Sequence, residues 1–320
     1  MDTLLDKLNI FENTIAAKWW NHLFVELADP RTNDWPLMRN PIYGLMIIGA
    51  YLYFVLSWGP KFMANRKPYK MTKLLIVYNA AQVVVSCMLT YEAVTHGYFF
   101  GPYSLRCEPV DTSRSPAAMR AARAFYWYFL AKISELLDTV FFVLRKKDKQ
   151  ITFLHLYHHT GMPMISWGCT KYFPGGHAAF IGMVNSMVHV VMYVYYLLSA
   201  LGPQWQKYLW WKKYITLLQL FQFGICFLHS AQLLYTDCGF PRWSIFFTLP
   251  NAIFFYFLFN DFYQKSYKER QDKKEAAERK LKEEQEATKE NGKNFSNGFF
   301  NANNGSTPNL MIHQNGKKIQ

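Results

Sequence analysis

The chain has 320 residues, of which 51% are hydrophobic and 18% are aromatic, and its formal net charge is +13. So high a hydrophobic content is unusual for a soluble domain, although the mean hydropathy of -0.09 is close to zero. The lysines and arginines form short clusters between apolar runs, a pattern typical of membrane proteins that argues against nucleic-acid binding. The five cysteines include no CxxC pair, so no disulfide-dense scaffold or zinc site is expected.

Seven apolar segments approach the roughly 20 residues that a helix needs to cross a bilayer. They lie near 42-60, 74-95, 116-144, 151-170, 177-200, 214-236 and 243-263. The sequence therefore predicts an all-α membrane protein with seven transmembrane helices. The N-terminal residues lack a basic stretch followed by an apolar core, so no cleaved signal peptide is expected.

The loops that follow alternate spans are basic: KFMANRKPYK, RKKDK and QWQKYLWWKK. Because basic loops lie in the cytosol, the N-terminus is predicted to be lumenal and the C-terminus cytosolic. We divide the chain into a lumenal N-terminal segment (1-41), a seven-helix domain (42-264) and a charged cytosolic tail (265-320). The tail begins with a mixed-charge stretch whose i, i+4 pairs could form a solvated helix and continues into an end rich in Asn, Gly and Ser, so it is predicted to be mobile and largely disordered.

The segment HLYHHT in the fourth span is the first candidate site. His155, His158 and His159 have the spacing i, i+3 and i+4, which places them on one helix face near the cytosolic end. Ionisable groups inside a span cost free energy and are usually functional. The alternative is that they are packing histidines whose hydrogen bonds are satisfied.

The third span contains a second candidate, KISELLDT, in which Lys132, Glu135 and Asp138 follow helical spacing. Charges of both signs on one face indicate an internal polar cavity rather than contact with lipid. The alternative is a buried ion pair that only fixes helix packing.

The fifth and sixth spans add further polar groups. Asn185, His189 and Tyr193 recur every four residues and form one stripe on the fifth span, and Gln219 lies in the sixth. A histidine box also suggests a membrane di-iron desaturase or hydroxylase, which we keep as the alternative function. However, two irons need more histidine ligands than this chain offers, so no metal is expected.

In this order, the segments DPRTNDWPLM, NRKPY, KISELLDT, HLYHH, NSMVHVVMY and TLLQLFQF resemble the fatty acid elongase (ELO) family across most of residues 29 to 264. The resemblance implies seven spans, six of them surrounding a narrow acyl tunnel closed at the lumenal end. It implies a very-long-chain 3-oxoacyl-CoA synthase of the endoplasmic reticulum, which condenses a long-chain acyl-CoA with malonyl-CoA to 3-ketoacyl-CoA, CO2 and CoA.

Both CoA esters are substrates, so the resemblance implies no cofactor. The implied partners are membrane lipid and the ketoacyl-CoA reductase, hydroxyacyl-CoA dehydratase and enoyl-CoA reductase of the elongation cycle. A homo-oligomer is also compatible with the sequence. Seven spans would equally describe a receptor or a transporter, but neither explains an ordered histidine box.

Neutral imidazole is a competent nucleophile toward a thioester. By resemblance, His158 is expected to carry the acyl group in a ping-pong reaction, and His189 to engage the same site. His155 and His159 would orient the nucleophile and donate to the developing enolate. A direct condensation, in which histidines act only as acid and base, stays open.

The remaining polar residues are expected to bind or position substrate. Lys132 would attract the malonyl carboxylate or a CoA phosphate, Glu135 and Asp138 would position the cations and imidazoles, and Asn185 would fix a histidine tautomer. Tyr193 and Gln219 complete this expected set.

Two further expectations concern the compartment. The proposed topology places Cys107 and Cys238 in lumenal loops, where a disulfide can form, and the resemblance supports that pairing; the alternative is five reduced cysteines. Lys317 and Lys318 resemble a dilysine retrieval signal for the endoplasmic reticulum; the alternative is a chance occurrence, because the tail is rich in lysine.

Overall fold

The computed structural model describes residues 14–101 and 103–302, and these residues form helices and connecting loops with no strand. The chain divides into two units, Met1–Tyr263 and Gln264–Gln320. The α-helices of the first unit are α2 (Ile15–Asn21), α3 (Ile42–Tyr53), α4 (Gly59–Met63), α5 (Thr72–Tyr91), α6 (Pro116–Ser134), α7 (Leu136–Leu144), α8 (Phe153–Tyr172), α9 (Ala179–Ala200), α10 (Pro203–Gln206), α11 (Lys212–Ala231) and α12 (Ile245–Tyr263).

Short π- and 3₁₀-helical segments join or extend these helices. They are η1 (His22–Glu26), η2 (Phe54–Trp58), η3 (Glu92–Phe99), η4 (Asp148–Gln150), η5 (Gly176–Ala178), η6 (Gln232–Leu234) and η7 (Arg242–Ser244). The second unit contains η8 (Gln264–Lys268) and α13 (Glu269–Ala302). The mixed-charge stretch of the tail is helical in its described part, and its charges offer the i, i+4 pairing seen between Lys274 and Glu278 at 3.7 Å.

Among the described residues, five helical runs are long and apolar enough to cross a membrane: Ile42–Met63, Thr72–Phe99, Gly176–Ala200, Lys212–Leu234 and Arg242–Glu286. These runs make the chain a multi-pass membrane protein. The expected third and fourth spans also form helices, namely α6 with α7, and α8. These helices carry the charged residues and the histidine box, which lower their hydropathy, so the count of seven spans stays a prediction.

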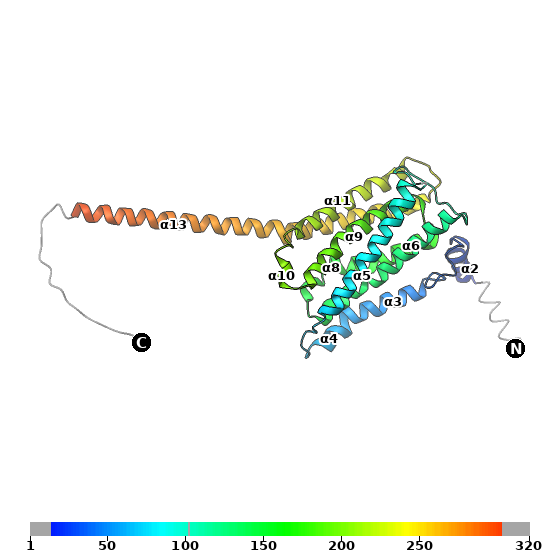
Figure 1. Cartoon of the computed structure of the whole chain (residues 1–320), viewed down its shortest axis with the longest axis horizontal. Coiled ribbons are helices and arrows are strands. Elements are labelled where there is room, and N and C mark those ends of the chain that lie inside the picture. The colour runs from blue at the N-terminus through cyan, green and yellow to red at the C-terminus, as the bar shows by residue number, and fades with distance from the viewer. Residues whose placement is uncertain (1–13, 102, 303–320) are drawn as a thin grey trace. The chain divides into compact units, whose positions relative to one another are not determined.

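Six helices of the first unit close into a ring. α5 packs against α9, α9 against α11, α11 against α12, α12 against α8, α8 against α6, and α6 against α5. Figure 1 shows the labelled members running side by side. Outside this ring, α4 and η2 pack against α7. The space inside the ring therefore has walls from six helices.

Local signals in the sequence begin the helices that matter for the site. Ser115 caps α6, its Oγ accepting from Ala118 N at 3.1 Å, and Pro116 follows at the first helical position. Thr152 caps α8 in the same way, accepting from His155 N at 3.2 Å. Glu135 alone separates α6 from α7, and its carbonyl accepts from Asp138 N at 3.1 Å, a tight turn inside one long helical run.

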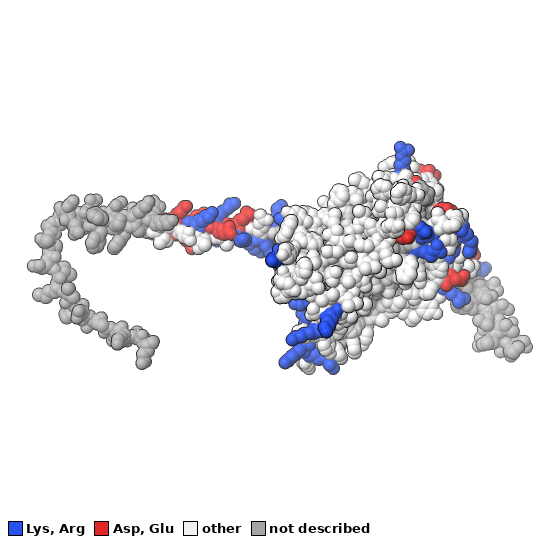
Figure 2. All heavy atoms as spheres, in the orientation of Figure 1, with Lys and Arg blue, Asp and Glu red and all other residues white. Residues whose placement is uncertain are grey.

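Charged side chains gather at the ends of the helices of the first unit and leave the body between them largely uncharged (Figure 2). The basic segments at 61–73, 145–149 and 207–213 join α4 to α5, α7 to α8 and α9 to α11, so they lie at the same end of an alternating bundle. We call this the basic end, and the opposite end, where η3 leads to α6 and α8 to α9, the loop end. An uncharged middle between polar ends is the surface that a bilayer requires.

A hydrophobic cluster of Phe173, Leu233 and Phe240 lies at the loop end, with Cys107 and Cys238 packed against it. Cys107 and Cys238 form a disulfide with a Cα–Cα distance of 5.8 Å, the pairing expected from the sequence. Cys87, Cys169 and Cys226 are free thiols. The disulfide joins the loop before α6 to the loop before α12, so it links two segments at the loop end.

The segment 29–38, part of the sequence resemblance, has a structural role at this end. The Arg31 guanidinium is buried against Asp29, with Nη2 2.7 Å from Oδ2, and it also donates to the Asp111 carbonyl at 2.6 Å. Lys171 of α8 is fully buried and donates to Asn33 Oδ1 and to the carbonyl of Met38. Buried cations need such partners, so this segment is held firmly on the bundle.

Candidate functional site

The three histidines of the box lie on α8 as the spacing predicts, and their rings are in contact. The ring centroids of His155 and His159 are 4.1 Å apart, and those of His158 and His159 are 5.2 Å apart. His155 Nε2 lies 2.8 Å from Thr139 Oγ1 on α7, and this hydroxyl lies 2.9 Å from Tyr51 OH on α3. His155 is thus anchored through α7 to a helix outside the ring.

A buried ionic cluster lies on α6 and α9. Lys132 Nζ donates to both carboxylate oxygens of Glu135, at 2.8 and 3.1 Å, and lies 3.4 Å from either ring nitrogen of His189. His189 Nδ1 is 3.1 Å from Glu135 Oε1. Each of these side chains is at most 6% exposed, so the charges are paired away from solvent. The carboxylate favours a proton on Nδ1 of His189 and leaves Nε2 as the basic nitrogen.

Two further contacts join α9 to α6 and to α7. On α9, Asn185 Oδ1 accepts from Tyr128 OH of α6 at 2.7 Å, and Tyr193 OH donates to Asp138 Oδ2 of α7 at 2.8 Å. Tyr128 was not among the residues expected from the sequence. Its position one turn before Lys132 was the available signal, and the Lys132 ammonium lies 4.8 Å from the centre of the Tyr128 ring.

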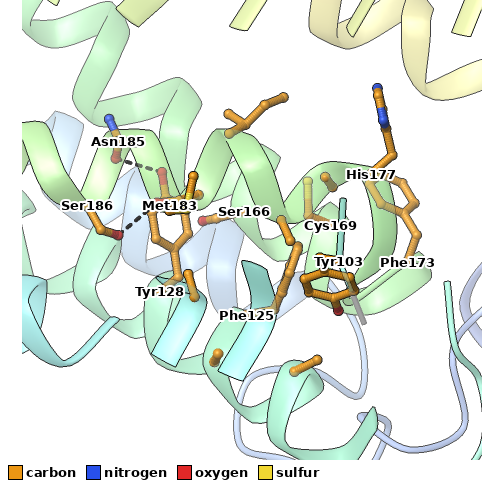
Figure 3. Close-up of a pocket in the computed structure, with 18 of the residues that line it drawn as sticks. Tyr103, Phe125, Tyr128, Ser166, Cys169, Phe173, His177, Met183, Asn185 and Ser186 are labelled. Carbon is orange, nitrogen blue, oxygen red and sulfur yellow. Dashed lines mark hydrogen bonds between the residues drawn. The ribbon is translucent and has the colours of Figure 1, made fainter. Parts of the chain in front are cut away.

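The ring of helices encloses a cavity of about 570 Å³, within the usual range for a ligand pocket. All six ring helices contribute to its wall, including Leu89 (α5), Tyr128 (α6), His158 (α8), Asn185 (α9), Gln222 (α11) and Phe255 (α12). Figure 3 shows Tyr128 and Asn185 joined by their hydrogen bond, with Phe173, Tyr103 and His177 farther along the same cavity. The cavity therefore extends from the histidine box toward the loop end.

Tyr103 lies in the loop before α6 and lines the loop end of the cavity. Its hydroxyl accepts from Gly176 N at 3.4 Å. Burial raises the pKa of the Tyr103 phenol, so this group stays neutral. The Tyr103 hydroxyl therefore adds a polar atom, but no charge, to the loop end of the cavity.

Of the four candidate histidines, all of which the structure describes, only His158 is among the residues lining this cavity. Its ring meets Phe255 of α12 edge to face, with centroids 5.4 Å apart. His189 does not line the cavity but belongs to the buried ionic cluster, and His155 is hydrogen-bonded to Thr139. The structure thus separates the histidines into one that faces the cavity and three around it.

The remaining expected residues divide in a similar way. Asn185 lines the cavity, whereas Lys132, Glu135, Asp138 and Tyr193 are engaged with one another or with His189. Gln219 donates to Met192 Sδ at 3.8 Å and is not among the lining residues, while Gln222, one turn later, is. Lys317 and Lys318 lie outside the described residues.

Among the described residues, no group of three or more His, Cys, Asp or Glu side chains is arranged to hold a metal ion. The three box histidines contact each other as rings rather than converging their nitrogens on a point with carboxylates. The arrangement is instead one imidazole at the wall of an apolar cavity, surrounded by a hydrogen-bonded polar shell. Such a site can present a neutral nucleophile to a long apolar substrate.

Residues 36–275 match the ELO family, described as the GNS1/SUR4 family. The chain is 46% identical to very long chain fatty acid elongase 7 of Drosophila melanogaster over 265 residues, 82% of this chain and 80% of that protein. It is 44% identical to very long chain fatty acid elongase 4 of Homo sapiens over 281 residues, 85% and 88% of the two chains. A very long chain fatty acid elongase of Aedes aegypti is 47% identical over 257 residues, 80% and 72% of the two chains.

Proposed function

Since this chain belongs to the ELO (GNS1/SUR4) family of fatty acid elongases, we propose that it condenses a long-chain acyl-CoA with malonyl-CoA to give 3-ketoacyl-CoA, CO2 and CoA. The cavity supports this proposal because its wall is mostly apolar and it extends from the histidine box toward the loop end, which suits an acyl chain. The family membership does not favour the di-iron desaturase or hydroxylase considered from the histidine box.

One observation carries the proposed mechanism: His158 alone of the four candidate histidines lines the cavity. An acyl chain in the cavity would place its thioester carbonyl beside this ring. A ring nitrogen of His158 attacks the carbonyl carbon, the C–S bond breaks, and CoA leaves as a thiolate that takes up a proton. The product of this half-reaction is an acyl-imidazole.

The second half-reaction forms the carbon–carbon bond. Malonyl-CoA loses CO2, its α-carbon attacks the acyl carbonyl, and the imidazole of His158 leaves. The enolate that forms on the way needs a hydrogen-bond donor or cation nearby. For this role we propose His189, which is held by Glu135 and Lys132, together with the remaining box histidines.

Lys132 acts in this scheme as a positioning residue. Its ammonium is buried and donates to both oxygens of Glu135, which holds His189 in turn. Release of that ammonium to a malonyl carboxylate would leave Glu135 unpaired in the bundle, at high cost. The contacts therefore support a role through His189 better than direct attraction of substrate.

The proposal is tested by incubating the purified chain with acyl-CoA in the absence of malonyl-CoA. We expect about one equivalent of free CoA and an adduct of acyl mass on the peptide that contains HLYHH. His158→Ala should lose both signals, while His22→Ala, an exposed histidine of η1 that does not line the cavity, should keep them. Release of CoA only when malonyl-CoA is present would replace the covalent route with direct condensation.

The setting of the reaction is part of the proposal. We place seven spans in the endoplasmic reticulum membrane, with the N-terminus in the lumen and the basic end in the cytosol, where both CoA esters are available. His158 lies in the second turn of α8, close to the basic end. The ketoacyl-CoA reductase, hydroxyacyl-CoA dehydratase and enoyl-CoA reductase would take the product onward.

A further inference from the structure

The loop end of the cavity contains polar side chains that the proposed mechanism does not use. His177 of η5, Ser244 of η7 and Thr248 of α12 all line the cavity. We call these three residues the distal set. His177 and Ser244 are 3% and 2% exposed. Along α8 the distance from His158 to the loop end is roughly 22 Å, at about 1.5 Å per residue, so the distal set is far from the reacting carbon.

The distal set has hydrogen-bonding atoms without partners. Among the described residues, both ring nitrogens of His177, Ser244 Oγ and Thr248 Oγ1 are buried and make no hydrogen bond. A buried polar group left without a partner is costly, so an occupant of this part of the cavity should supply hydrogen bonds.

Unpartnered polar atoms are concentrated in this cavity. Apart from Thr90, every described residue that has a buried side-chain atom without a hydrogen bond also lines the cavity. By contrast, hydroxyls that line the middle of the cavity are satisfied: Ser166 donates to the Pro163 carbonyl at 3.1 Å and Ser186 to the Gly182 carbonyl at 2.8 Å. The atoms of the distal set, which have no hydrogen-bond partner, therefore differ from the hydrogen-bonded hydroxyls in the same cavity wall.

The ring of His177 is held in place while its nitrogens remain open. It stacks on His229 with centroids 3.9 Å apart and planes 14° apart, and the Phe240 ring meets it at 5.7 Å. His229 is itself fixed, since Gln232 Nε2 lies 3.2 Å from its Nδ1 and its Nε2 lies 3.1 Å from the His177 carbonyl. A fixed ring with free donor and acceptor atoms is a preorganised binding group.

We propose that the distal set binds a hydroxyl group at or near the far end of the acyl chain, so that the enzyme accepts long-chain acyl thioesters with an ω-terminal hydroxyl. A hydroxyl both donates and accepts, which matches an imidazole and two hydroxyl groups. A carboxylate fits less well, because Arg120 is the one Lys or Arg among the described lining residues, and it already pairs with Glu92 at 3.8 Å. This inference rests on the proposed function.

The test compares ω-hydroxyacyl-CoA with unsubstituted acyl-CoA of equal carbon number over a series of lengths, with the purified full chain and malonyl-CoA. The measured quantity is the ratio of the two kcat/KM values. We expect this ratio to have a maximum at the length that reaches the distal set. His177→Phe, which retains a ring against His229, should lower the ratio at that length about tenfold, the value of one lost hydrogen bond.

Two further variants make the result decisive. Ser244→Ala with Thr248→Val should also lower the ratio. This double variant replaces His177→Phe as the test if thermal denaturation shows that His177→Phe does not fold. Ser166→Ala removes a cavity hydroxyl that already has a backbone partner, so the ratio should be unchanged. A ratio without a maximum, or equal in the wild type and both distal variants, would mean that only water occupies the set and would overturn the inference.

The two proposals fail in different ways. Turnover of unsubstituted chains with malonyl-CoA reports on the proposed function alone. If unsubstituted chains are condensed and the distal variants have no effect on the ratio, the inference fails and the proposed function stands. If neither chain type is condensed, both are overturned.

Discussion

Glu135 Oε1 lies 3.1 Å from His189 Nδ1, although Glu135 joins α6 to α7 and His189 lies in the middle of α9. The same carboxylate accepts from Lys132 Nζ at 2.8 Å, so one buried anion serves a cation and an imidazole together. The stability of the bundle and the orientation of the imidazole are therefore coupled through one side chain. Variants of Glu135 and Lys132 can separate the two effects.

Glu135→Leu should destabilise the protein by about 3 kcal/mol or more, because it leaves Lys132 buried without its anion. Activity should fall as well, since His189 loses the group that fixes its tautomer. Thermal unfolding in detergent and kcat with acyl-CoA and malonyl-CoA measure the two effects. The double variant Lys132→Met with Glu135→Leu should recover most of the stability, because paired charges are replaced by apolar groups, without recovering activity.

Recovery of activity in that double variant would show that the ionic cluster serves packing alone. Loss of stability in the double variant equal to that in Glu135→Leu would show that burial of unpaired Lys132 is not the cause. The two outcomes are independent, so the role in activity and the role in stability are tested separately.

Thr139→Val should lower kcat about tenfold with little change in KM. Valine has nearly the shape of threonine but cannot bond to His155 Nε2, which lies 2.8 Å from the Thr139 hydroxyl. Tyr51→Phe is the matched control, because it removes only the bond from Tyr51 to Thr139 and leaves His155 its partner. Equal kcat values for the two variants would argue against a role for Thr139 in holding His155.

The disulfide should stabilise the loop end. Cys107 and Cys238 are 131 residues apart, for which the chain-entropy model gives about 5 kcal/mol, an upper value for a bundle whose helices persist on unfolding. Cys107→Ser with Cys238→Ser should therefore lower the midpoint of thermal unfolding, whereas Cys87→Ser, an exposed free cysteine, should not. Peptide mapping without reductant should yield the linked pair, and alkylation of both thiols would contradict it.

Retrieval to the endoplasmic reticulum should depend on Lys317 and Lys318. If the tail is cytosolic and these lysines are read as a dilysine signal, Lys317→Ser with Lys318→Ser should shift part of the protein to later secretory compartments in fluorescence imaging. Lys289→Ser with Lys293→Ser removes two lysines from the same tail and should leave the distribution unchanged. An unaltered reticular pattern in the first variant would remove the retrieval signal and leave the topology as proposed.

The sequence by itself determined the helical class, the membrane setting and the family. Runs of apolar residues near 20 in length have few alternatives to helices in a bilayer, because each backbone group must be satisfied within its own segment. Helical spacing also placed His155, His158 and His159 on one face, and it placed Lys132 beside Glu135. Both are local relationships that depend on 3.6 residues per turn and on little else.

Only the tertiary structure decided which of these residues share a site. Helical spacing predicts one stripe of Asn185, His189 and Tyr193 on α9, yet each contacts a different partner on α6 or α7. Asn185 contacts Tyr128, His189 contacts the Lys132–Glu135 pair, and Tyr193 contacts Asp138. The reason is that α6 and α9 run in the same direction along the ring, so successive turns of one helix face successive turns of the other. That register depends on side-chain packing between segments far apart in the chain, which sequence periodicity does not contain.

The same limit applies to the cavity. The periodicity of α8 shows that the box histidines share a face, but the rotation of α8 against α12 decides that His158 is the one beside Phe255 and the open space. Gln219 and Gln222 on α11 are equivalent in composition, and only the packing of α11 directs Gln222 to the cavity. His177 is an isolated histidine in the sequence, and its place in the wall of the same cavity as Ser244 and Thr248 exists only because the six helices close into a ring.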